Sequence, residues 1–255
     1  MYLSYTYYKI SLLSLFLFLF VQLQAQNTER SYELARVGWN VKSQEIKHTG
    51  YTTSFNSNWQ IPNWVAYEHT KEKAEGTVAR PKMPFLPDPD AKGMKAEHRD
   101  YSNSGYSRGH MAPAGDMKWS EEAMYESFYL SNICPQKAEL NDGAWKRLEG
   151  RVRALAKEGS VYICCGPIVN ESPKRIGQHK VAVPNQFFKA LCMRRKGKWQ
   201  AIAFLFPNSD CKGSMFDYAI SVNELEQITG YDFFYNLPDE IEFVVETQCR
   251  MKDWQ

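Results

Sequence analysis

The chain has 255 residues, of which 44% are hydrophobic and 24% are charged, a composition typical of a folded globular protein rather than a disordered one. Its 15 Gly and 12 Pro follow no fixed period, which excludes a collagen-like or low-complexity chain. Lys and Arg total 31 against 29 Asp and Glu, so the formal net charge is +2. This value excludes a strongly basic, histone-like binder but allows a local basic cleft.

The first 25 residues have the pattern of a targeting segment. Lys9 precedes an apolar run over residues 10–21, which is shorter than the roughly 20 apolar residues that a membrane span needs. Ala25 supplies a small residue at the expected cleavage site. We expect residues 1–25 to be a signal peptide and residues 26–255 to be the folded domain. The protein is then secreted or periplasmic, without stable membrane association after cleavage; an uncleaved N-terminal anchor is the alternative.

The rest of the chain predicts one α+β domain with a mixed or antiparallel sheet. Residues 26–58 show few clear periods. Residues 71–100, rich in Pro, Lys and Asp, predict a long surface loop. The other expected elements, in chain order, are a strand over 59–69, helices over 121–129 and 141–157, a strand over 161–169, a hairpin of 186–193 and 199–207 around an exposed turn at 194–198, and a helix over 222–229 capped by Gly230.

Six cysteines follow the leader: Cys134, Cys164, Cys165, Cys192, Cys211 and Cys249. An exported chain can hold disulfides, whereas cysteines in apolar runs are also typical of buried free thiols, and both alternatives stay open. The absence of a CxxC pair or a Cys/His cluster argues against a structural zinc site.

A turn-rich segment and a following helix carry the residues suited to phosphodiester chemistry. His110 follows Arg108 and Gly109, and a histidine can act as a general base near neutral pH. Asn141, Trp145, Glu149 and Arg153 recur every four residues, so neighbouring members share a helix face. An amide oxygen suits a hydrated Mg²⁺, and arginine can clamp phosphate oxygens.

The motifs that contain these residues resemble the DNA/RNA non-specific endonucleases, the secreted sugar-non-specific nucleases and their endonuclease G relatives. The matching segments are 104–116 (SGYSRGHMAPAGD), 129–136 (YLSNICPQ), 140–149 (LNDGAWKRLE), 62–67 (PNWVAY), 183–189 (VPNQFFK) and 221–234 (SVNELEQITGYDFF). The resemblance covers about residues 50–240. It implies a ββα-metal (His-Me finger) motif, in which a hairpin carries the histidine and a helix carries the metal ligand.

The resemblance also implies the reaction and the roles of single residues. DNA and RNA would be cut with little sequence preference, leaving a 5′-phosphate, with Mg²⁺ as cofactor and Mn²⁺ as a substitute. His110 is the implied general base, Asn141 the direct metal ligand and Glu149 the holder of metal-bound water. Arg80, Arg108 and Arg153 are implied to stabilise phosphate charge, and Asn132 and Gln136 to support the site or contact substrate. Relatives that are often dimers make a homodimer an expectation too.

One position departs from the family pattern, and several residues keep a second interpretation. Ser107 stands where the family usually has Asp, which we expect to change metal affinity and pH optimum while activity survives. Asn141 could also cap its helix, and Asp116 is either an acid that supports the site or a turn residue. Trp145 is expected in the core. His48, His69, His98 and His179 are expected to be surface or structural residues.

Two other functions remain as alternatives. One is a secreted nucleic-acid-binding protein that has lost catalysis, against which the retained His110, Asn141 and Glu149 argue. The other is a metal-dependent phosphodiesterase for a small or lipid substrate, which the lack of a His/Asp cluster disfavours.

Overall fold

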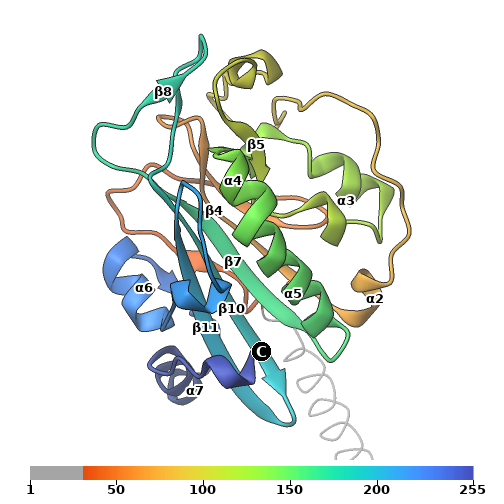
Figure 1. Ribbon diagram of the computed structural model, residues 1–255, viewed down its shortest axis with the longest axis vertical. Coiled ribbons are helices and arrows are strands. Elements are labelled where there is room, and N and C mark those ends of the chain that lie inside the picture. Colours follow the sequence, from red (N-terminus) through yellow and green to blue (C-terminus); the bar gives the residue numbers. More distant parts are fainter. Residues whose placement is uncertain (1–30, 255) are drawn as a thin grey trace, which may run out of the picture. The chain divides into compact units, whose positions relative to one another are not determined.

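The computed structural model describes residues 31–254 (Figure 1). The expected signal peptide at residues 1–25 lies outside this range. Within it, no helix combines the length and the apolar character required to cross a bilayer.

A seven-stranded antiparallel sheet forms the centre of the domain (Figure 1). Its spatial order is β12-β11-β10-β7-β4-β3-β2. The strands are β2 (Gln44–Lys47), β3 (Thr52–Asn56), β4 (Ile61–His69), β7 (Val161–Ile168), β10 (Gln186–Arg195), β11 (Lys198–Pro207) and β12 (Ala219–Ile220). The structure confirms the strands expected at 59–69 and 161–169 and the expected hairpin, now β10 and β11. Strands β2 and β3 were not predicted, because their residues follow no clear apolar period.

The central strands are buried on both faces, and alternate residues point into two separate cores. On β4, Val65 and Tyr67 join the larger core, whereas Trp64 and Ala66 join the smaller one. This is the two-residue period of a strand. The larger core lies against α5 (Lys146–Ala156), and the smaller one against α6 (Val222–Thr229) and α7 (Asp239–Glu246).

A hairpin and a helix form a ββα unit on the face of the larger core (Figure 1). The strands β5 (Ser107–His110) and β6 (Ile133–Gln136) pair antiparallel, and His110 lies opposite Ile133. A helical run follows as α4 (Ala138–Leu140), the π-helical segment η4 (Asn141–Trp145) and α5. The helix therefore begins three residues before its predicted start. Asn141 lies inside the run and is not its N-cap, because its N–H already donates to the Lys137 carbonyl, 2.9 Å away.

The remaining elements correct or confirm smaller predictions. Helix α3 (Glu121–Glu126) ends three residues early, and α6 ends as expected at Gly230, whose φ of 68° is left-handed. The predicted loop 71–100 contains α2 (Lys71–Ala74) and begins the 3₁₀ turn η1 (His98–Tyr101). The other short elements are β1 (Ala35–Arg36) with β13 (Asp232–Phe233), β8 (Arg175–Ile176) with β9 (Val181–Ala182), and 3₁₀ turns η2 (Ala114–Asp116), η3 (Leu130–Asn132), η5 (Met215–Tyr218) and η6 (Met251–Asp253).

All six cysteines are free thiols, and only Cys249 is exposed. The sequence left open disulfides or buried free thiols, and the structure has free thiols. The histidines were expected to be surface or structural residues, and His48 and His69 are buried, which fits the structural alternative. His48 Nε2 lies 3.0 Å from Asp88 Oδ2, a hydrogen bond that ties the long loop to the turn between β2 and β3.

Candidate active site

His110 ends strand β5 inside an aromatic pocket. Its ring centroid lies 5.2 Å from that of Phe85 and 5.6 Å from that of Phe128. Its Nε2 atom is buried and has no hydrogen-bond partner among the described residues. Burial, reinforced by the positive charge of Arg80, lowers the pKa of His110 to about 3. The imidazole is therefore neutral near physiological pH, with one ring nitrogen free to accept a proton.

The buried side chain of Asn132 fixes the turn after His110 through hydrogen bonds to the backbone. The Asn132 side chain is fully buried, accepts from the Ala112 N–H at 2.8 Å and donates to the carbonyls of Ala112 and Ser127, both at 2.9 Å. Gln136 is also fully buried, and a Cβ on Gly109 would overlap its amide. Glycine is therefore required between Arg108 and His110. Both polar residues lie where they support the strand rather than where substrate could reach them.

Trp145 joins the helix to the strand that carries His110. Its Nε1 donates to the His110 carbonyl at 3.2 Å, and its indole is 1% exposed against Phe187 and Phe206. The expectation that Trp145 belongs to the core is confirmed. The π-helical segment before it contains Gly143 at φ −98° and ψ −112°, outside helical values. Such bulges are frequent at functional sites, and this one sets the direction of the Asn141 side chain relative to the rest of the helix.

Asn141 is half-buried and opens the π-helical segment. Its Nδ2 donates to Asp142 Oδ1 at 3.0 Å, and no described residue donates a hydrogen bond to its amide oxygen. That oxygen is a neutral hard donor of the kind that binds Mg²⁺ together with water. Asn141 thus keeps a free oxygen atom that could bind a metal at the start of the π-helical segment of the ββα unit.

Glu149 lies two turns further along the helix with a strongly perturbed carboxyl. Burial, opposed by the positive charges of Lys189 and Arg153 and helped by the negative charge of Asp116, raises its pKa to about 7. A carboxyl at this balance is part protonated in the metal-free protein, and a nearby cation would favour its ionised form. The orphaned His110 nitrogen, the free Asn141 oxygen and the poised Glu149 carboxyl together fit a hydrated divalent ion. Among the described residues there is no cluster of three or more His, Cys, Asp or Glu suited to a metal.

Lys189 is a residue of this region that the sequence analysis missed. Its side chain is fully buried on β10, its Nζ has no hydrogen-bond partner in the described structure, and it lies 4.3 Å from the centroid of the Trp145 ring. A buried ammonium on an aromatic face gains a cation–π interaction. The two-residue period of the strand could have revealed it, because Lys189 lies on the same strand face as Phe187 and Leu191, which are both buried in the larger core.

Arg153 is held by a buried carboxylate. Its Nη1 lies 2.8 Å from Asp116 Oδ1, and the Tyr67 hydroxyl donates to Asp116 Oδ2 at 2.8 Å. Asp116 is 0% exposed, whereas the Arg153 side chain keeps 34% of its surface. The Asp116 carboxylate therefore positions an arginine while its backbone lies in the 3₁₀ turn η2, so features of both interpretations left open by the sequence are present.

The other two predicted arginines lie beside the rings that surround His110. The Arg80 guanidinium is 5.2 Å from the Phe128 centroid, and that of Arg108 is 5.9 Å from the Phe85 centroid. Arg108 also donates to the His98 carbonyl at 2.7 Å and to Ser102 Oγ at 3.1 Å. Arg80 is exposed, whereas Arg108 is anchored, so the structure brings both near the histidine but leaves only Arg80 free to move.

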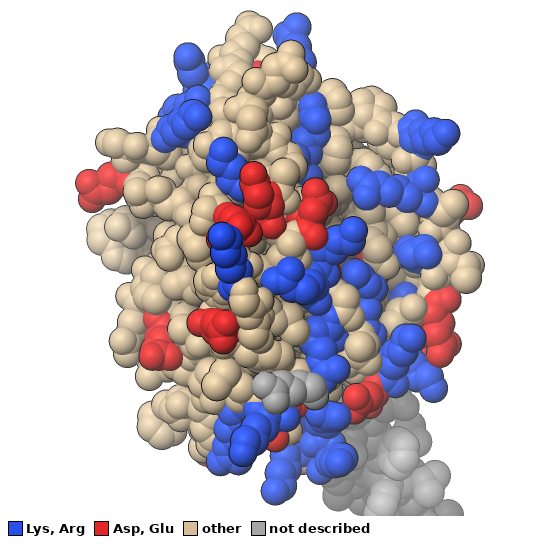
Figure 2. All heavy atoms as spheres, viewed as in Figure 1, with Lys and Arg blue, Asp and Glu red and all other residues tan. Residues whose placement is uncertain are grey.

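Positive charge gathers on the surface around this site. Figure 2 shows a band of Lys and Arg over the region of α5, whose sequence KRLEGRVRALA supplies Lys146, Arg147, Arg151 and Arg153. The near-neutral chain thus carries a band of basic residues over α5, which suits an anionic polymer ligand.

Comparisons with known proteins agree with this geometry. The family model described as DNA/RNA non-specific endonuclease matches residues 30–240. "Nuclease EXOG, mitochondrial" of Xenopus laevis is 35% identical over 227 residues, with 82% of this chain and 63% of that protein covered. "Endonuclease G, mitochondrial" of Homo sapiens is 30% identical over 220 residues, with 80% of this chain and 74% of that protein covered. The chain thus spans less than two thirds of the length of the EXOG nuclease.

A solved structure described as the EndoG/EndoGI complex has the same fold. It superposes with a TM-score of 0.73 at 28% identity and covers 80% of this chain and 91% of its own. The α+β domain with a central antiparallel sheet is thereby confirmed.

The names of the relatives correct the expected location. Both relatives are named mitochondrial nucleases, and so is "Nuclease 1" of Schizosaccharomyces pombe, which contradicts a secreted or periplasmic protein. An apolar run near the N-terminus does not by itself specify the compartment to which a chain is sent.

Proposed function

Since the chain belongs to the DNA/RNA non-specific endonuclease family, we propose that residues 26–255 form a Mg²⁺-dependent endonuclease that hydrolyses DNA and RNA with little sequence preference. The observation that carries this proposal is the unpartnered, buried Nε2 of His110 at the end of β5, held next to the helix of Asn141 by the Trp145 hydrogen bond. DNA and RNA are the substrates, and Mn²⁺ is the expected substitute for Mg²⁺.

His110 is proposed to accept the proton of the attacking water. Its low pKa keeps the imidazole in the neutral form that this role needs. The aromatic rings of Phe85 and Phe128 pack against the imidazole and limit its rotation. The activated water then attacks phosphorus in line with the 3′-oxygen, the bond from phosphorus to that oxygen breaks, and the oxygen takes a proton from water, which gives a 5′-phosphate and a 3′-hydroxyl.

Asn141 and Glu149 are proposed to hold the cation, Asn141 directly through its amide oxygen and Glu149 through water. A divalent ion there supplies Lewis-acid charge at the phosphate. The positive charge of such an ion would favour the ionised form of the Glu149 carboxyl, whose pKa is otherwise about 7.

Arg80, Arg108 and Arg153 are proposed to offset the negative charge that develops on the phosphate. Preorganised cations in a partly buried site contribute more than the same charges in water. Arg153 is preorganised by Asp116, and Arg108 by the His98 carbonyl. The exposed Arg80 lies close enough to His110 to depress its pKa, so it is suited to meet the phosphate at the same place.

The departure at Ser107 is compatible with activity. Ser107 and Gly109 share one side of β5, whereas Arg108 and His110 share the other, because side chains alternate along a strand. A change at residue 107 therefore does not remove a group from the side that carries the proposed base. This supports the nuclease over the binding protein that has lost catalysis.

The proposal is tested with the full chain and an Asn141→Ala variant on end-labelled DNA and RNA across a Mg²⁺ titration. We expect 5′-phosphate ends on both substrates, and an Asn141→Ala enzyme that needs much more Mg²⁺ and turns over at least about 100-fold more slowly. A Glu139→Ala variant, at an exposed residue of the same helical run, is the matched control. Products with 3′-phosphate ends, or an unchanged metal titration for Asn141→Ala, would overturn these assignments. Light scattering of the same preparation tests the expected homodimer.

A further inference from the structure

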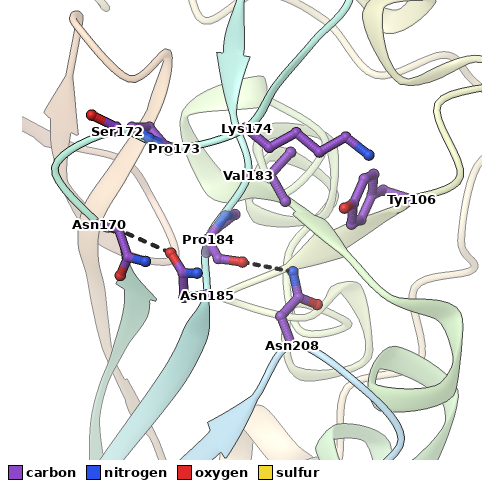
Figure 3. A pocket seen from close by; sticks show the side chains of 9 residues that line it. All are labelled: Tyr106, Asn170, Ser172, Pro173, Lys174, Val183, Pro184, Asn185 and Asn208. Carbon is purple, nitrogen blue, oxygen red and sulfur yellow. Dashed lines mark hydrogen bonds between the residues drawn. The ribbon is translucent and has the colours of Figure 1, made fainter.

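A polar pocket opens beside the start of β5, away from the proposed catalytic groups. It has a volume of about 250 Å³, and Figure 3 shows Tyr106, Lys174, Asn185 and Asn208 among the side chains that line it. These come from the segment before β5, the loop before β8, the segment before β10 and the end of β11. Segments far apart in the sequence thus build one concave surface.

Two lysines converge on the ring of Tyr106. The Nζ of Lys137 lies 4.8 Å from the ring centroid and that of Lys174 lies 5.2 Å from it. Neither ammonium forms a salt bridge with any described carboxylate. The ring holds both charges in place by cation–π attraction, which costs them less freedom when a ligand binds. Two unpaired ammonium groups fixed beside a polar pocket form a site for an anion with several oxygens.

The pocket wall is rigid because Asn208 ties its parts together. Asn208 Oδ1 accepts from the Lys137 N–H at 2.7 Å, and its Nδ2 donates to the carbonyls of Pro184 at 2.9 Å and Pro135 at 3.2 Å. Figure 3 shows the bond to Pro184 and a second bond, from the Asn170 N–H to Asn185 Oδ1, across the pocket. The backbone that carries Lys137 is therefore fixed to the end of β11.

Tyr106 directly precedes the strand, and Lys137 the helical run, that carry the proposed catalytic residues. Tyr106 precedes Arg108 by two residues and His110 by four, the spacing of one strand face. Lys137 precedes Asn141 by four residues, one turn along the helical run. At about 3.3 Å per strand residue, four residues separate Tyr106 from His110 by roughly 13 Å. A stacked strand rising about 3.4 Å per nucleotide covers that distance in about four nucleotides.

We propose that Lys137, Lys174 and Tyr106 form a second phosphate subsite, which binds the substrate strand a few nucleotides from the bond that is cut. This inference rests on the proposed nuclease function and deepens it. The lysines bind the backbone phosphate of DNA or RNA alike, and the amides of Asn170 and Asn185 face the sugar or base. The subsite contributes affinity and length preference, and it takes no part in bond cleavage.

The test measures binding without cleavage. In a His110→Ala background with Mg²⁺, fluorescence anisotropy gives the Kd for a labelled single-stranded oligonucleotide at several salt concentrations. The test variant carries Lys137→Gln and Lys174→Gln. The matched control carries Lys196→Gln and Lys198→Gln, two exposed lysines at the far tip of the β10–β11 hairpin, which removes the same charge. Melting curves confirm that each protein is folded.

We expect the Lys137/Lys174 variant to raise Kd by about 10-fold at moderate salt and to reduce the slope of log K against log salt by about 1.4, the value for two lost phosphate contacts on a single strand. The Lys196/Lys198 control stays within about two-fold. Tyr106→Leu weakens binding, whereas Tyr106→Phe, which keeps the ring, does not.

Three results would overturn the subsite. A Kd of the Lys137/Lys174 variant equal to that of the parent protein shows that the pocket lysines have no role, and equal weakening by both double variants shows only general charge attraction. Loss of binding by Tyr106→Phe as large as that of Tyr106→Leu contradicts the role of the ring. Cleavage by the chain with native His110 is assayed in parallel: a chain that cuts but fails these criteria refutes the subsite alone, and one that neither cuts nor binds refutes the nuclease and the subsite together.

Discussion

The indole Nε1 of Trp145 donates a hydrogen bond to the backbone carbonyl of His110 across 3.2 Å. This bond joins the helix that carries Asn141 and Glu149 to the strand that carries the proposed base. The indole is itself fixed between Phe187 and Phe206 in the larger core. The relative placement of the proposed base and the proposed metal ligand is thus set by a core residue that need not touch substrate.

Replacing Trp145 with Phe tests this coupling. The phenyl ring keeps most of the packing but removes the donor, so the strand end loses a hydrogen bond worth about 1 kcal/mol. We expect kcat to fall about 10-fold with little change in KM, because small misplacements of a reacting group are costly. Steady-state kinetics at saturating Mg²⁺ measure this, with Trp119→Phe as a control. Unchanged kcat would show that the bond does not position the histidine.

Replacing the buried Lys189 should affect activity and stability differently. Its positive charge holds down the pKa of Glu149, so Lys189→Met should move the acidic limb of the pH–activity profile upward by about one unit. The same change removes an unpartnered buried ammonium and should leave the melting temperature equal or higher. Lys189→Arg keeps the charge and should keep the limb closer to wild type. A profile that is unmoved in Lys189→Met contradicts the coupling.

Arg153→Ala should destabilise the fold as well as the activity. The change leaves Asp116 fully buried with only the Tyr67 hydroxyl as partner, which costs about 3 kcal/mol. Arg147→Ala, on the exposed side of the same helix, should change stability by less than about 0.5 kcal/mol. Urea unfolding of both variants checks the difference, and equal midpoints would show that the ion pair is not structural.

Glu246 on α7 gives the fold a pH dependence that is independent of the active site. Its side chain is buried, its Oε1 lacks a partner in the described structure, and burial with the charges of Glu226, Glu242 and Asp232 raises its pKa to about 9. A carboxyl that holds its proton more tightly when folded contributes stability at acid pH, and this is lost as the pH rises from 4.5 toward 9.

Glu246→Gln mimics the protonated carboxyl and should remove this loss. We expect the variant to be more stable than wild type by roughly 2 kcal/mol at pH 8 and nearly equal at pH 5. Denaturant unfolding at the two pH values is the measurement. A stability gain that is the same at both values would mean that the carboxyl does not titrate in this range.

The sequence predicted the parts of the fold whose apolar period is strong. Strands β4, β7, β10 and β11 and helix α6 all lie within two residues of their expected bounds. Strands β2 and β3 were missed because β3 is buried on both faces although it carries Thr, Ser and Asn. Their polar groups are paired inside the protein, as Thr53 Oγ1 with the Ser131 carbonyl shows at 3.0 Å, and no hydrophobic pattern reports such pairing.

The candidate site was predictable where motif residues lie close in the chain, and less so where distant residues meet. His110, Asn141, Glu149 and Arg108 follow from two short motifs. The carboxylate that pairs with Arg153 is 37 residues away in the sequence, and Lys189 acts on the pKa of Glu149 from a separate element, strand β10. The aromatic wall of Phe85 and Phe128 was missed because a Pro-rich loop and the end of a helix gave no sign that they meet.

The most direct test of the account is cleavage of plasmid DNA and of total RNA by the full chain, with Mg²⁺ or with EDTA, beside His110→Ala and His98→Gln. His98 is the matched control, because its ring stacks on the same Phe85 at 6.0 Å and we propose no role for its side chain in the reaction. The account predicts that both substrates are lost with Mg²⁺, that EDTA and His110→Ala each abolish this, and that His98→Gln stays within a few-fold of wild type. Full cleavage by His110→Ala would contradict it.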